Sequence, residues 1–471
     1  MNKRVQVAKY LAFDLLGSFV AWLLFHRYRK EVIEPQLFGY NPGFEFDTNV
    51  IMGLVFLPVF WVLLFFVAGF YRDVLRRSRL KELGLSIGVT LLGVIVIFFL
   101  LLLDDFVASY KSYYQLFFTL LLLQFSLTYF PRLMVTSITT HRIRKGKLTF
   151  PTLIVGDGDN ALKVYNEFRN ERIPQGNRVV GYISAGVEVN PMLASELPCL
   201  GNCSKLREVV DEFKIDEIVL AVDQKDSKVL SSVVNEVLLL NISVKAIPSM
   251  YDFLTGRVKM SQIFGTPLIQ ISFDLMPIWQ QKIKALIDFV SSAIALVVLS
   301  PVIAVIAVGI KLTSKGPVFF AQERVGQYGK PFSIYKFRSM YVDAEANGPA
   351  LSTKNDKRIT PLGRFLRKTR FDEIPNFWNV LKGDMSLVGP RPERQFYIDQ
   401  IVKEAPHYIH LQKVKPGITS WGQVKYGYAE NVDEMVERLK YDLLYIENMS
   451  LFVDFKILIY TLITVFRGRG V

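Results

Sequence analysis

Residues 289–310 read FVSSAIALVVLSPVIAVIAVGI, an apolar stretch on which the organisation of the C-terminal half depends. It is long enough for a helix to cross a hydrocarbon core about 30 Å thick, but Ser300 and Pro301 interrupt it. Proline removes the hydrogen bond to the carbonyl four residues back, which belongs to Val297, and its ring clashes there. We therefore predict two helical segments that meet at a sharp kink.

The charges that flank this stretch bear on its topology. Lys282 and Lys284 precede it, and Lys311 and Lys315 follow it. Because positive charges stay on the cytoplasmic side, neither end is marked as the outside end. A helix pair over residues 282–312 that enters and leaves the membrane on its cytoplasmic face satisfies both observations. The alternative is an ordinary fifth span with a proline kink, which would carry everything after Lys311 across the membrane.

The composition of the whole chain indicates an integral membrane protein. Hydrophobic residues make up 51% of the 471 residues, and the mean hydropathy is +0.27, with the apolar residues gathered in long runs. The formal net charge of +13 is compatible with nucleic acid, anionic lipid or an anionic substrate as partners. The membrane runs favour a phospholipid membrane and an anionic substrate, and we expect no nucleic-acid partner.

Residues 1–145 are predicted to form a transmembrane domain of four helices. The predicted spans are Tyr10–Phe25, Val50–Tyr71, Leu83–Leu103 and Tyr113–Phe130. Asp14 lies inside the first span, and we expect either an interfacial position or a helix–helix contact for it. Basic clusters follow the second and the fourth span, which predicts that both termini of this domain face the cytoplasm.

Residues 146–250 have the sequence pattern of a soluble α/β domain. Alternating strands and helices predict a small doubly wound, Rossmann-like sheet. The predicted strands are 152–155, 179–183, 217–222 and 243–246. The turn Gly156-x-Gly158-x-x-Ala161 is a weak pyrophosphate-binding signal. Ser184 ends the second strand where a dinucleotide-binding domain carries an acid, so a scaffolding or regulatory role is favoured. Residues 251–281 are predicted to be a connector.

An acidic pair stands out in the basic segment that follows. Asp372 and Glu373 could simply begin a helix, but two carboxylates 4 Å apart repel by roughly 4 kcal/mol at an effective dielectric constant near 20. A divalent cation with nearby arginines would relieve this repulsion and would also neutralise a diphosphate. An aspartate can attack phosphorus and form an aspartyl-phosphate, and such transfer is catalysed mainly by positioning and cationic clamps.

Candidate clamps lie on both sides of the pair. Residues 335–340 alternate apolar and cationic side chains like a half-exposed strand, which places Lys336 and Arg338 on one face. Arg367 belongs to a basic run before the pair, and this run could equally bind lipid headgroups. Arg391 lies between two prolines, which restrict the backbone and make it the best single clamp.

The region from Gln281 to Val471 resembles the bacterial sugar transferases, the monotopic polyprenyl-phosphate phosphoglycosyl transferases. The motifs that carry the resemblance are Lys284 to Asp288, Ser300-Pro301, Lys336 to Met340, Asp372-Glu373, Lys382 to Pro392 and Lys415 to Thr419. Their order and combination are highly specific. With four spans and an α/β domain in front, the whole chain resembles the long form of the family, the undecaprenyl-phosphate hexose-1-phosphate transferases.

The resemblance implies a catalytic domain at 282–471 with a covalent mechanism. Asp372 would attack the β-phosphate of a UDP-sugar with release of UMP, and undecaprenyl phosphate would then take the phosphosugar from it. Glu373 would bind Mg²⁺, and a re-entrant membrane helix would be hinged at Ser300-Pro301. The residues expected at the substrate phosphates are Lys336, Arg338, Arg367 and Arg391.

The resemblance also implies a place for the reaction. The catalytic domain of a multi-pass protein of the bacterial inner membrane would face the cytoplasm and start exopolysaccharide, capsule or O-antigen synthesis. Glucose and galactose differ at one hydroxyl, so UDP-glucose and UDP-galactose both remain open as donors, as does a homodimer. The chain departs from the family pattern at Ala285, often Arg, and at Ser420, often Gly, and neither departure reaches the acidic pair.

Two other functions are compatible with parts of the sequence. A membrane-anchored nucleotide-sugar dehydratase or oxidoreductase would use the α/β domain, but no recognisable Tyr-x-x-x-Lys pair follows there. A non-enzymatic, nucleotide-sensing membrane protein would carry a degenerate C-terminal domain. The intact Asp372-Glu373 pair counts against it.

Overall fold

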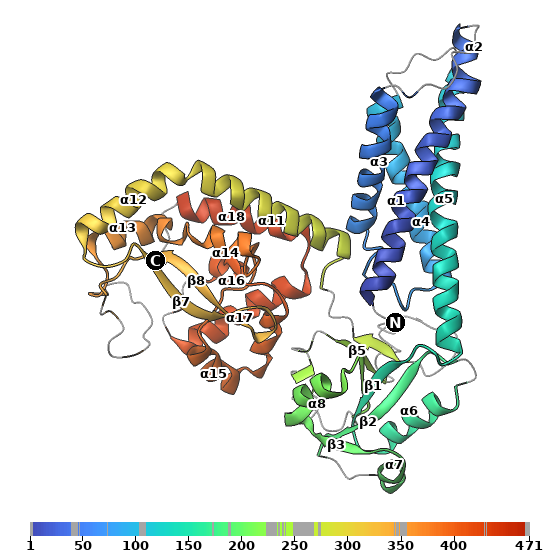
Figure 1. Cartoon of the computed structure of the whole chain (residues 1–471). Coiled ribbons are helices and arrows are strands. Elements are labelled where there is room, and N and C mark those ends of the chain that lie inside the picture. Colours follow the sequence, from blue (N-terminus) through green and yellow to red (C-terminus); the bar gives the residue numbers. More distant parts are fainter. Residues whose placement is uncertain are drawn as a thin grey trace. The chain divides into compact units, whose positions relative to one another are not determined.

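The computed structural model describes the chain except for residues 1–2, 39–45, 47, 73, 103–109, 172–173, 187–189, 223–232, 234–235, 238–239, 241, 248–267, 272–274, 343, 345–347, 349–355, 428, 430 and 467–471. The chain divides into two compact units, residues 1–149 with 172–177 and residues 150–171 with 178–471. Figure 1 shows the helices and strands of both.

Four helices of the first unit are long and apolar enough to cross a membrane. They are α1 (Lys3–Tyr28), α3 (Thr48–Val67), α4 (Arg79–Ile97) and α5 (Tyr110–Arg144). Short segments extend two of them, η1 (Arg29–Ile33) and α2 (Glu34–Phe38) after α1, and η2 (Phe98–Leu102) after α4. The four predicted helices are confirmed. The last one runs on past Phe130 because Thr136 and Thr139 continue its buried face and meet α1 through Tyr10 and Gln6.

A buried ion pair joins α1 to α5. Arg132 donates through Nε to Oδ1 of Asp14 at 2.7 Å, and both side chains are fully buried. The hydroxyl of Tyr71 donates to Oδ2 of Asp14 at 2.7 Å, and the Arg132 guanidinium lies 3.9 Å from the ring centroid of Phe65. Of the two positions expected for Asp14, the structure therefore shows the helix–helix contact.

The α/β sheet has six strands in the order β3-β2-β1-β4-β5-β6. They are β1 (Phe150–Val155), β2 (Asn177–Ser184), β3 (Cys199–Asn202), β4 (Glu217–Leu220), β5 (Ser243–Ala246) and β6 (Ile269–Ile271). The pairs β1–β4, β2–β3 and β4–β5 are parallel, whereas β5–β6 is antiparallel. The helices are α6 (Asp159–Arg169), α7 (Pro191–Glu196) and α8 (Leu206–Phe213), with η3 (Cys203–Lys205) before the last.

All four predicted strands are present in this sheet, and two further strands are not predicted from the sequence. β3 is short and contains Gly201 but no β-branched residue, so it lacks the composition typical of a strand. β6 lies within the predicted connector at 251–281, much of which is outside the described residues. An antiparallel edge strand this short has no distinct sequence signal.

The apolar stretch at 289–310 forms a bent helix pair. α11 (Ile278–Val298) and α12 (Ser300–Thr313) meet at an angle of 59°, so the predicted kink is confirmed. The Ser300 hydroxyl donates to the carbonyl of Val297 at 2.7 Å, the acceptor that Pro301 leaves without an amide. Large apolar side chains remain exposed along both helices, Leu312 at 83%.

The rest of the C-terminal region contains two short sheets and several helices, of which α14 (Asn376–Lys382) and α18 (Leu451–Phe466) contact α11. β7 (Phe319–Val325) and β8 (Pro331–Phe337) form an antiparallel hairpin, and β9 (Ser386–Val388) pairs in parallel with β10 (Gly417–Thr419). The other helices are α13 (Pro361–Thr369), α15 (Gln395–Glu404), α16 (Trp421–Lys425) and α17 (Val432–Glu447). Single turns form η4 (Gln327–Gly329) and η5 (Phe371–Glu373), and η6 (Pro406–Lys413) is a longer 3-10 segment. Figure 1 shows α18 beside α11.

Candidate active site

The acidic pair lies in a sharp turn between α13 and α14. Arg370 ends α13 in a left-handed conformation with φ of 63°, a conformation that non-glycine residues rarely adopt. The single turn η5 follows at once and carries both acids. Asp372 is 7% exposed and Glu373 is 8% exposed. Two carboxylates are therefore buried next to each other, where burial penalises their charged forms.

Three cations converge on Glu373. Lys336 of β8 donates to Oε1 of Glu373 at 2.7 Å. Arg391 approaches the same oxygen with Nη1 at 3.7 Å, and Nη1 of Arg370 lies 3.5 Å from Oε2. Burial alone would raise the pKa of Glu373, but Lys336, Arg391 and Arg370 outweigh it and hold this pKa well below its usual range. Glu373 is therefore ionised at neutral pH.

Asp372 has a different environment. Within the part of the chain that the structure describes, no hydrogen bond or ion pair engages its carboxylate. Burial, and next the charge of Glu373, raises the pKa of Asp372 to about 6, against the opposing effect of Lys336, Arg367 and Arg370. Asp372 is thus an uncommitted carboxylate that ionises just below neutral pH, which suits a nucleophile.

A buried amide fixes the strand that carries Lys336. Asn379 of α14 donates through Nδ2 to the carbonyl of Ser333 at 2.7 Å and accepts from the amide of Tyr335 at 3.1 Å. Asn379 is fully buried, so these two bonds have no competition from water. They hold β8 against the helix that follows the acidic pair, and they thereby set the distance between Lys336 and Glu373.

Arg391 lies between two carboxylates. Besides Glu373, its Nε lies 3.9 Å from Oε1 of Glu393. Glu393 is buried and pairs with Arg438 at 2.7 Å and with Arg324 at 3.2 Å. Burial alone would raise the pKa of Glu393, but these arginines hold it below its usual value. A second ionised carboxylate therefore helps to position Arg391, through Nε rather than through Nη1.

Two glycine-proline motifs that lie far apart in the sequence meet beside Arg391. The amide of Gly389 donates to the carbonyl of Thr419 at 3.0 Å. The amide of Gly417 donates to the carbonyl of Pro390 at 2.9 Å. A Cβ atom on Gly417 would collide with the backbone of Gly389. The close approach therefore requires glycine, and it fixes the turn that presents Arg391.

Polar residues of α11 attach the bent helix pair to this turn. Lys284 donates to the carbonyl of Val388 at 3.0 Å and pairs with Asp454 at 2.6 Å. Asp288 accepts from the Ser386 hydroxyl at 2.7 Å. The motif from Lys284 to Asp288 therefore fixes β9, the strand that leads to Arg391. Ala285, where the sequence departs from the family pattern, is exposed.

The remaining predicted cations have other partners. Arg338 follows the end of β8, so strand alternation no longer keeps it with Lys336, and it donates to the carbonyls of Ser314 and Lys315 at 2.8 and 2.9 Å. Arg338 thus caps the C-terminal end of α12. Arg367 donates through Nε to Ser339 at 2.9 Å. Burial lowers the pKa of Arg367, and Asp372 is the main group that opposes this.

Sequence reasoning missed four residues of the site. Arg370 is a direct partner of Glu373, and its position next to the pair was a usable signal. Glu393, Arg324 and Arg438 form their network across residues that are far apart in the sequence. No spacing rule could have joined them, because only the fold brings them together.

Comparisons with known proteins match two parts of the chain to protein families. Residues 279–468 match the model of the family described as bacterial sugar transferase, and residues 67–248 match that of a CoA-binding domain. The UDP-N-acetylgalactosamine-undecaprenyl-phosphate N-acetylgalactosaminephosphotransferase of Aeromonas hydrophila is 42% identical over 232 residues, which cover 49% of this chain and 54% of that protein.

Two further relatives cover more of the chain. The UDP-glucose:undecaprenyl-phosphate glucose-1-phosphate transferase of Escherichia coli is 35% identical over 57% of this chain and 58% of its own length. The chain thus spans little more than half of these two named relatives. An uncharacterized sugar transferase of Haemophilus influenzae is 30% identical over 346 residues, 70% of this chain and 71% of that protein. On this coverage, the chain belongs to the bacterial sugar transferase family.

Proposed function

We propose that this protein transfers a hexose 1-phosphate from a UDP-sugar to undecaprenyl phosphate and releases UMP. Family membership and the activities for which the relatives are named support the substrate classes. The observation that carries the mechanism is the inequality of the two acids. Glu373 is surrounded by three cations, whereas Asp372 is buried beside it with a pKa raised to about 6.

In the first proposed step, a carboxylate oxygen of Asp372 attacks the β-phosphorus of the UDP-sugar. The bond from this phosphorus to the bridging oxygen breaks, and the electron pair leaves with UMP. The product is an aspartyl-phosphosugar on Asp372. Since Asp372 ionises near pH 6, the attacking form predominates at neutral pH.

In the second step, a phosphate oxygen of undecaprenyl phosphate attacks the same phosphorus. The bond to Asp372 breaks, the carboxylate is regenerated, and the lipid leaves as its diphosphate-linked sugar. Splitting one transfer into two displacements lets a single nucleophile serve a soluble donor and a lipid acceptor in turn.

The cations supply electrostatic stabilisation in both steps. Glu373 holds three cations in place, Lys336, Arg370 and Arg391. They are therefore preorganised to bind phosphate oxygens. Burial lowers the pKa of Arg367, and the charge of Asp372 opposes this effect. Arg367 is therefore proposed to contact the substrate phosphate beside Asp372. Arg338 caps α12, so we assign its contribution to the position of that helix.

We propose Mg²⁺ as a cofactor that is held jointly by a carboxylate of this site and by the substrate phosphates. No group of three or more His, Cys, Asp or Glu side chains gathers as a metal site among the described residues. Mg²⁺, however, is usually held by one or two carboxylates with substrate phosphates and water. Glu373, which stays ionised, is the proposed ligand. A bound Mg²⁺ would neutralise charge on the diphosphate.

We further propose that the bent pair α11–α12 is a re-entrant membrane element. Its 59° bend and the basic residues on both flanks support this topology. The catalytic region would then lie on the cytoplasmic side of the bacterial inner membrane, with the four apolar helices as spans. In this position the site would reach both UDP-sugars and the lipid phosphate.

The α/β domain is proposed to be a Rossmann-like scaffold rather than a second active site. Its strand order places β1 and β4 at the centre, as in dinucleotide-binding folds. The first glycine of its turn has a structural role, since a Cβ on Gly156 would lie 2.7 Å from the carbonyl oxygen of Ala221. Ser184 donates to Oδ2 of Asp157 at 2.6 Å, so a serine bound to this aspartate stands where a dinucleotide-binding domain carries an acid at the end of the second strand.

The proposal is tested on purified full-length protein with UDP-sugars labelled in the β-phosphate. Wild-type protein without acceptor should retain label, and undecaprenyl phosphate should chase it into lipid. Asp372→Ala should lose both reactions by at least about 10³-fold, whereas Asp399→Ala, at an exposed acid of α15, should keep them. Transfer at the wild-type rate by Asp372→Ala would refute the mechanism.

The same assay identifies the donor and the pathway step. UDP-glucose, UDP-galactose and UDP-N-acetylgalactosamine are compared by UMP release, since the relatives act on glucose and N-acetylgalactosamine donors. The lipid product is proposed to be the starting unit of a surface polysaccharide.

A further inference from the structure

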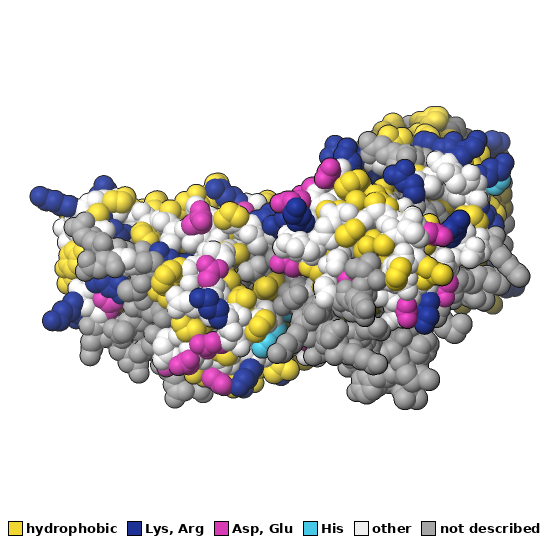
Figure 2. Space-filling view, turned by 90° about the horizontal axis from the view of Figure 1, so that it is seen from below, with side chains coloured by type: hydrophobic (Ala, Val, Ile, Leu, Met, Phe, Trp, Pro, Cys, Tyr) yellow, Lys and Arg dark blue, Asp and Glu magenta, His cyan; other side chains and the backbone are white. Residues whose placement is uncertain are grey.

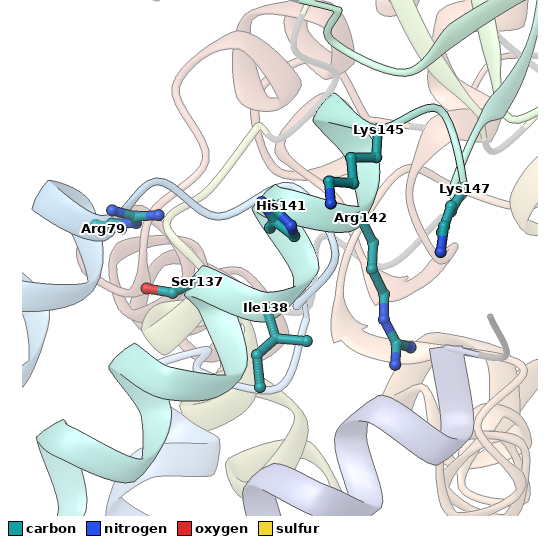
Figure 3. Close-up of a pocket in the computed structure, with 7 residues that line it drawn as sticks. All are labelled: Arg79, Ser137, Ile138, His141, Arg142, Lys145 and Lys147. Carbon is teal, nitrogen blue, oxygen red and sulfur yellow. The ribbon is translucent and has the colours of Figure 1, made fainter.

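The first unit contains a hollow of about 470 Å³ at the end of its longest helix. Its lining is Arg79, Ser137, Ile138, His141, Arg142, Lys145 and Lys147. Figure 3 shows Ser137 to Lys145 on the last turns of α5, Lys147 on the segment that follows, and Arg79 on a neighbouring helix. Arg142 and Lys147 extend to the same side of the ribbon.

The residues that line the hollow include two arginines, two lysines and a histidine, and none of the lining residues is acidic. Arg79, His141, Arg142, Lys145 and Lys147 are all exposed. The acid in the first turn of α4, Glu82, is fully buried and lies 3.5 Å from Arg77, so it does not neutralise the hollow. Figure 2 shows acidic and basic side chains interspersed over the face that it draws. The hollow therefore has the charge expected of an anion site.

An apolar stripe leads along α5 to the same place. Phe130, Met134 and Ile138 follow one another at intervals of four residues, so they share one face of the helix, and all three are exposed. Ile138 also lines the hollow. α5 is one of the helices long and apolar enough to cross a membrane. A free phosphate would make no use of such a stripe, whereas a phospholipid presents its phosphate and its acyl chains together.

We propose that the hollow binds the headgroup phosphate of an anionic phospholipid, with the acyl chains along Phe130, Met134 and Ile138. The bound lipid would belong to the leaflet at which α5 ends, where basic pockets beside membrane helices recognise anionic headgroups. The site uses none of the residues that carry the proposed transfer reaction. Its failure would leave the reaction at Asp372 untouched.

The test uses the full-length protein in detergent with fluorescent phosphatidylglycerol as probe. Binding to wild-type protein should exceed that of fluorescent phosphatidylcholine by roughly tenfold or more and should weaken as salt is added. Each removed charge should weaken binding roughly fivefold. The triple variant Arg79→Gln, Arg142→Gln, Lys145→Gln is therefore expected to lose roughly 100-fold in affinity.

Arg144→Gln is the matched control, since Arg144 is an exposed basic residue at the same helix end but outside the lining. It should bind within about twofold of wild type, because its charge does not face the hollow. Thermal unfolding and sugar-phosphate transfer of the triple variant should match wild type, which excludes misfolding. Equal binding of the two lipids, or undiminished binding by the triple variant, would overturn the proposal. Displacement of the probe by millimolar inorganic phosphate would also overturn it, as a free-anion site.

Discussion

Lys336 donates a 2.7 Å hydrogen bond to Glu373, whereas the neighbouring Asp372 receives no hydrogen bond among the described residues. Lys336, together with Arg391 and Arg370, keeps Glu373 ionised, whereas burial and the charge of Glu373 leave Asp372 with a raised pKa. This difference between the two acids is electrostatic in origin, because both are buried to nearly the same extent. Its consequences can be measured through Lys336 itself.

Lys336→Gln should slow trapping of the labelled phosphosugar by roughly 10²-fold at pH 7, the usual cost of one preorganised donor. Lys336 also lowers the pKa of Asp372, so its loss should shift the pH profile of trapping to higher pH. Lys330→Gln, at an exposed lysine in the turn of the same hairpin, is the control and should behave as wild type. An unshifted profile with a reduced rate would show that Lys336 contacts substrate without tuning Asp372.

The rate of covalent trapping should depend on pH through Asp372. Burial and the charge of Glu373 raise its pKa to about 6, and only the ionised form attacks phosphorus. The rate should reach a plateau above pH 7 and fall about tenfold per pH unit below pH 6. Single-turnover trapping across pH 4.5 to 8 measures this directly. A plateau that extends down to pH 4.5 would contradict a raised pKa.

Asp372→Asn should stabilise the protein at neutral pH. The folded pKa of about 6 exceeds the ordinary value of 3.8, so between these values the folded state binds more protons than the unfolded state. Stability is therefore lost as pH rises through this window, by up to roughly 3 kcal/mol above pH 6. The apparent Tm of the variant should exceed that of wild type at pH 7.5, and the difference should shrink at pH 4.5. An equal or lower Tm at pH 7.5 would show that burial does not destabilise this carboxylate.

The sequence predicts those features of the fold and the site that depend on neighbouring residues. The kink at Pro301 follows from one missing amide, and the four apolar helices follow from run length. The acidic pair and the Lys336 motif are local as well. The hydrogen-bond partners of Arg338 are not predictable in this way, because they depend on where the end of α12 lies.

The buried network around Glu393 is a second feature that the sequence does not predict. Its charges stand at 324, 393 and 438, and each is unremarkable in its own segment. They become one unit only because the β7–β8 hairpin, the turn with Arg391 and α17 pack together. Burial and pairing are properties of that packing and leave no periodic trace in the sequence.

Glu393→Gln should destabilise the C-terminal region strongly. It removes the charge that pairs with Arg438 and Arg324, both of which are largely buried, and uncompensated buried charges cost roughly 3–5 kcal/mol. Glu437→Gln breaks an exposed pair with Lys440 and should cost at most about 1 kcal/mol. Thermal unfolding monitored in detergent compares the two variants. Equal Tm values would mean that the Glu393 network contributes no net stability.

Cysteine labelling tests the re-entrant topology of α11–α12. In a Cys199→Ser, Cys203→Ser background, Lys282→Cys lies near the start of α11, Lys315→Cys follows the end of α12, and Tyr110→Cys marks the first residue of α5. An impermeant maleimide should label both flanks from the same side of the membrane, and Tyr110→Cys from the other. Opposite labelling of the two flanks would establish an ordinary span instead.

Pro301→Ala should weaken this topology, because the new amide can bond to the Val297 carbonyl and lets the helix straighten. A fraction of Lys315→Cys should then become accessible from the opposite side, and transfer activity should fall with it, since Ile310 of α12 packs in one apolar cluster with Leu366 of α13 and with Ile374, the residue after Glu373. Val305→Ala, at an exposed apolar position of α12, leaves the backbone unchanged and should keep both labelling and activity. Loss of activity without a change in labelling would place the effect of Pro301 on packing rather than on topology.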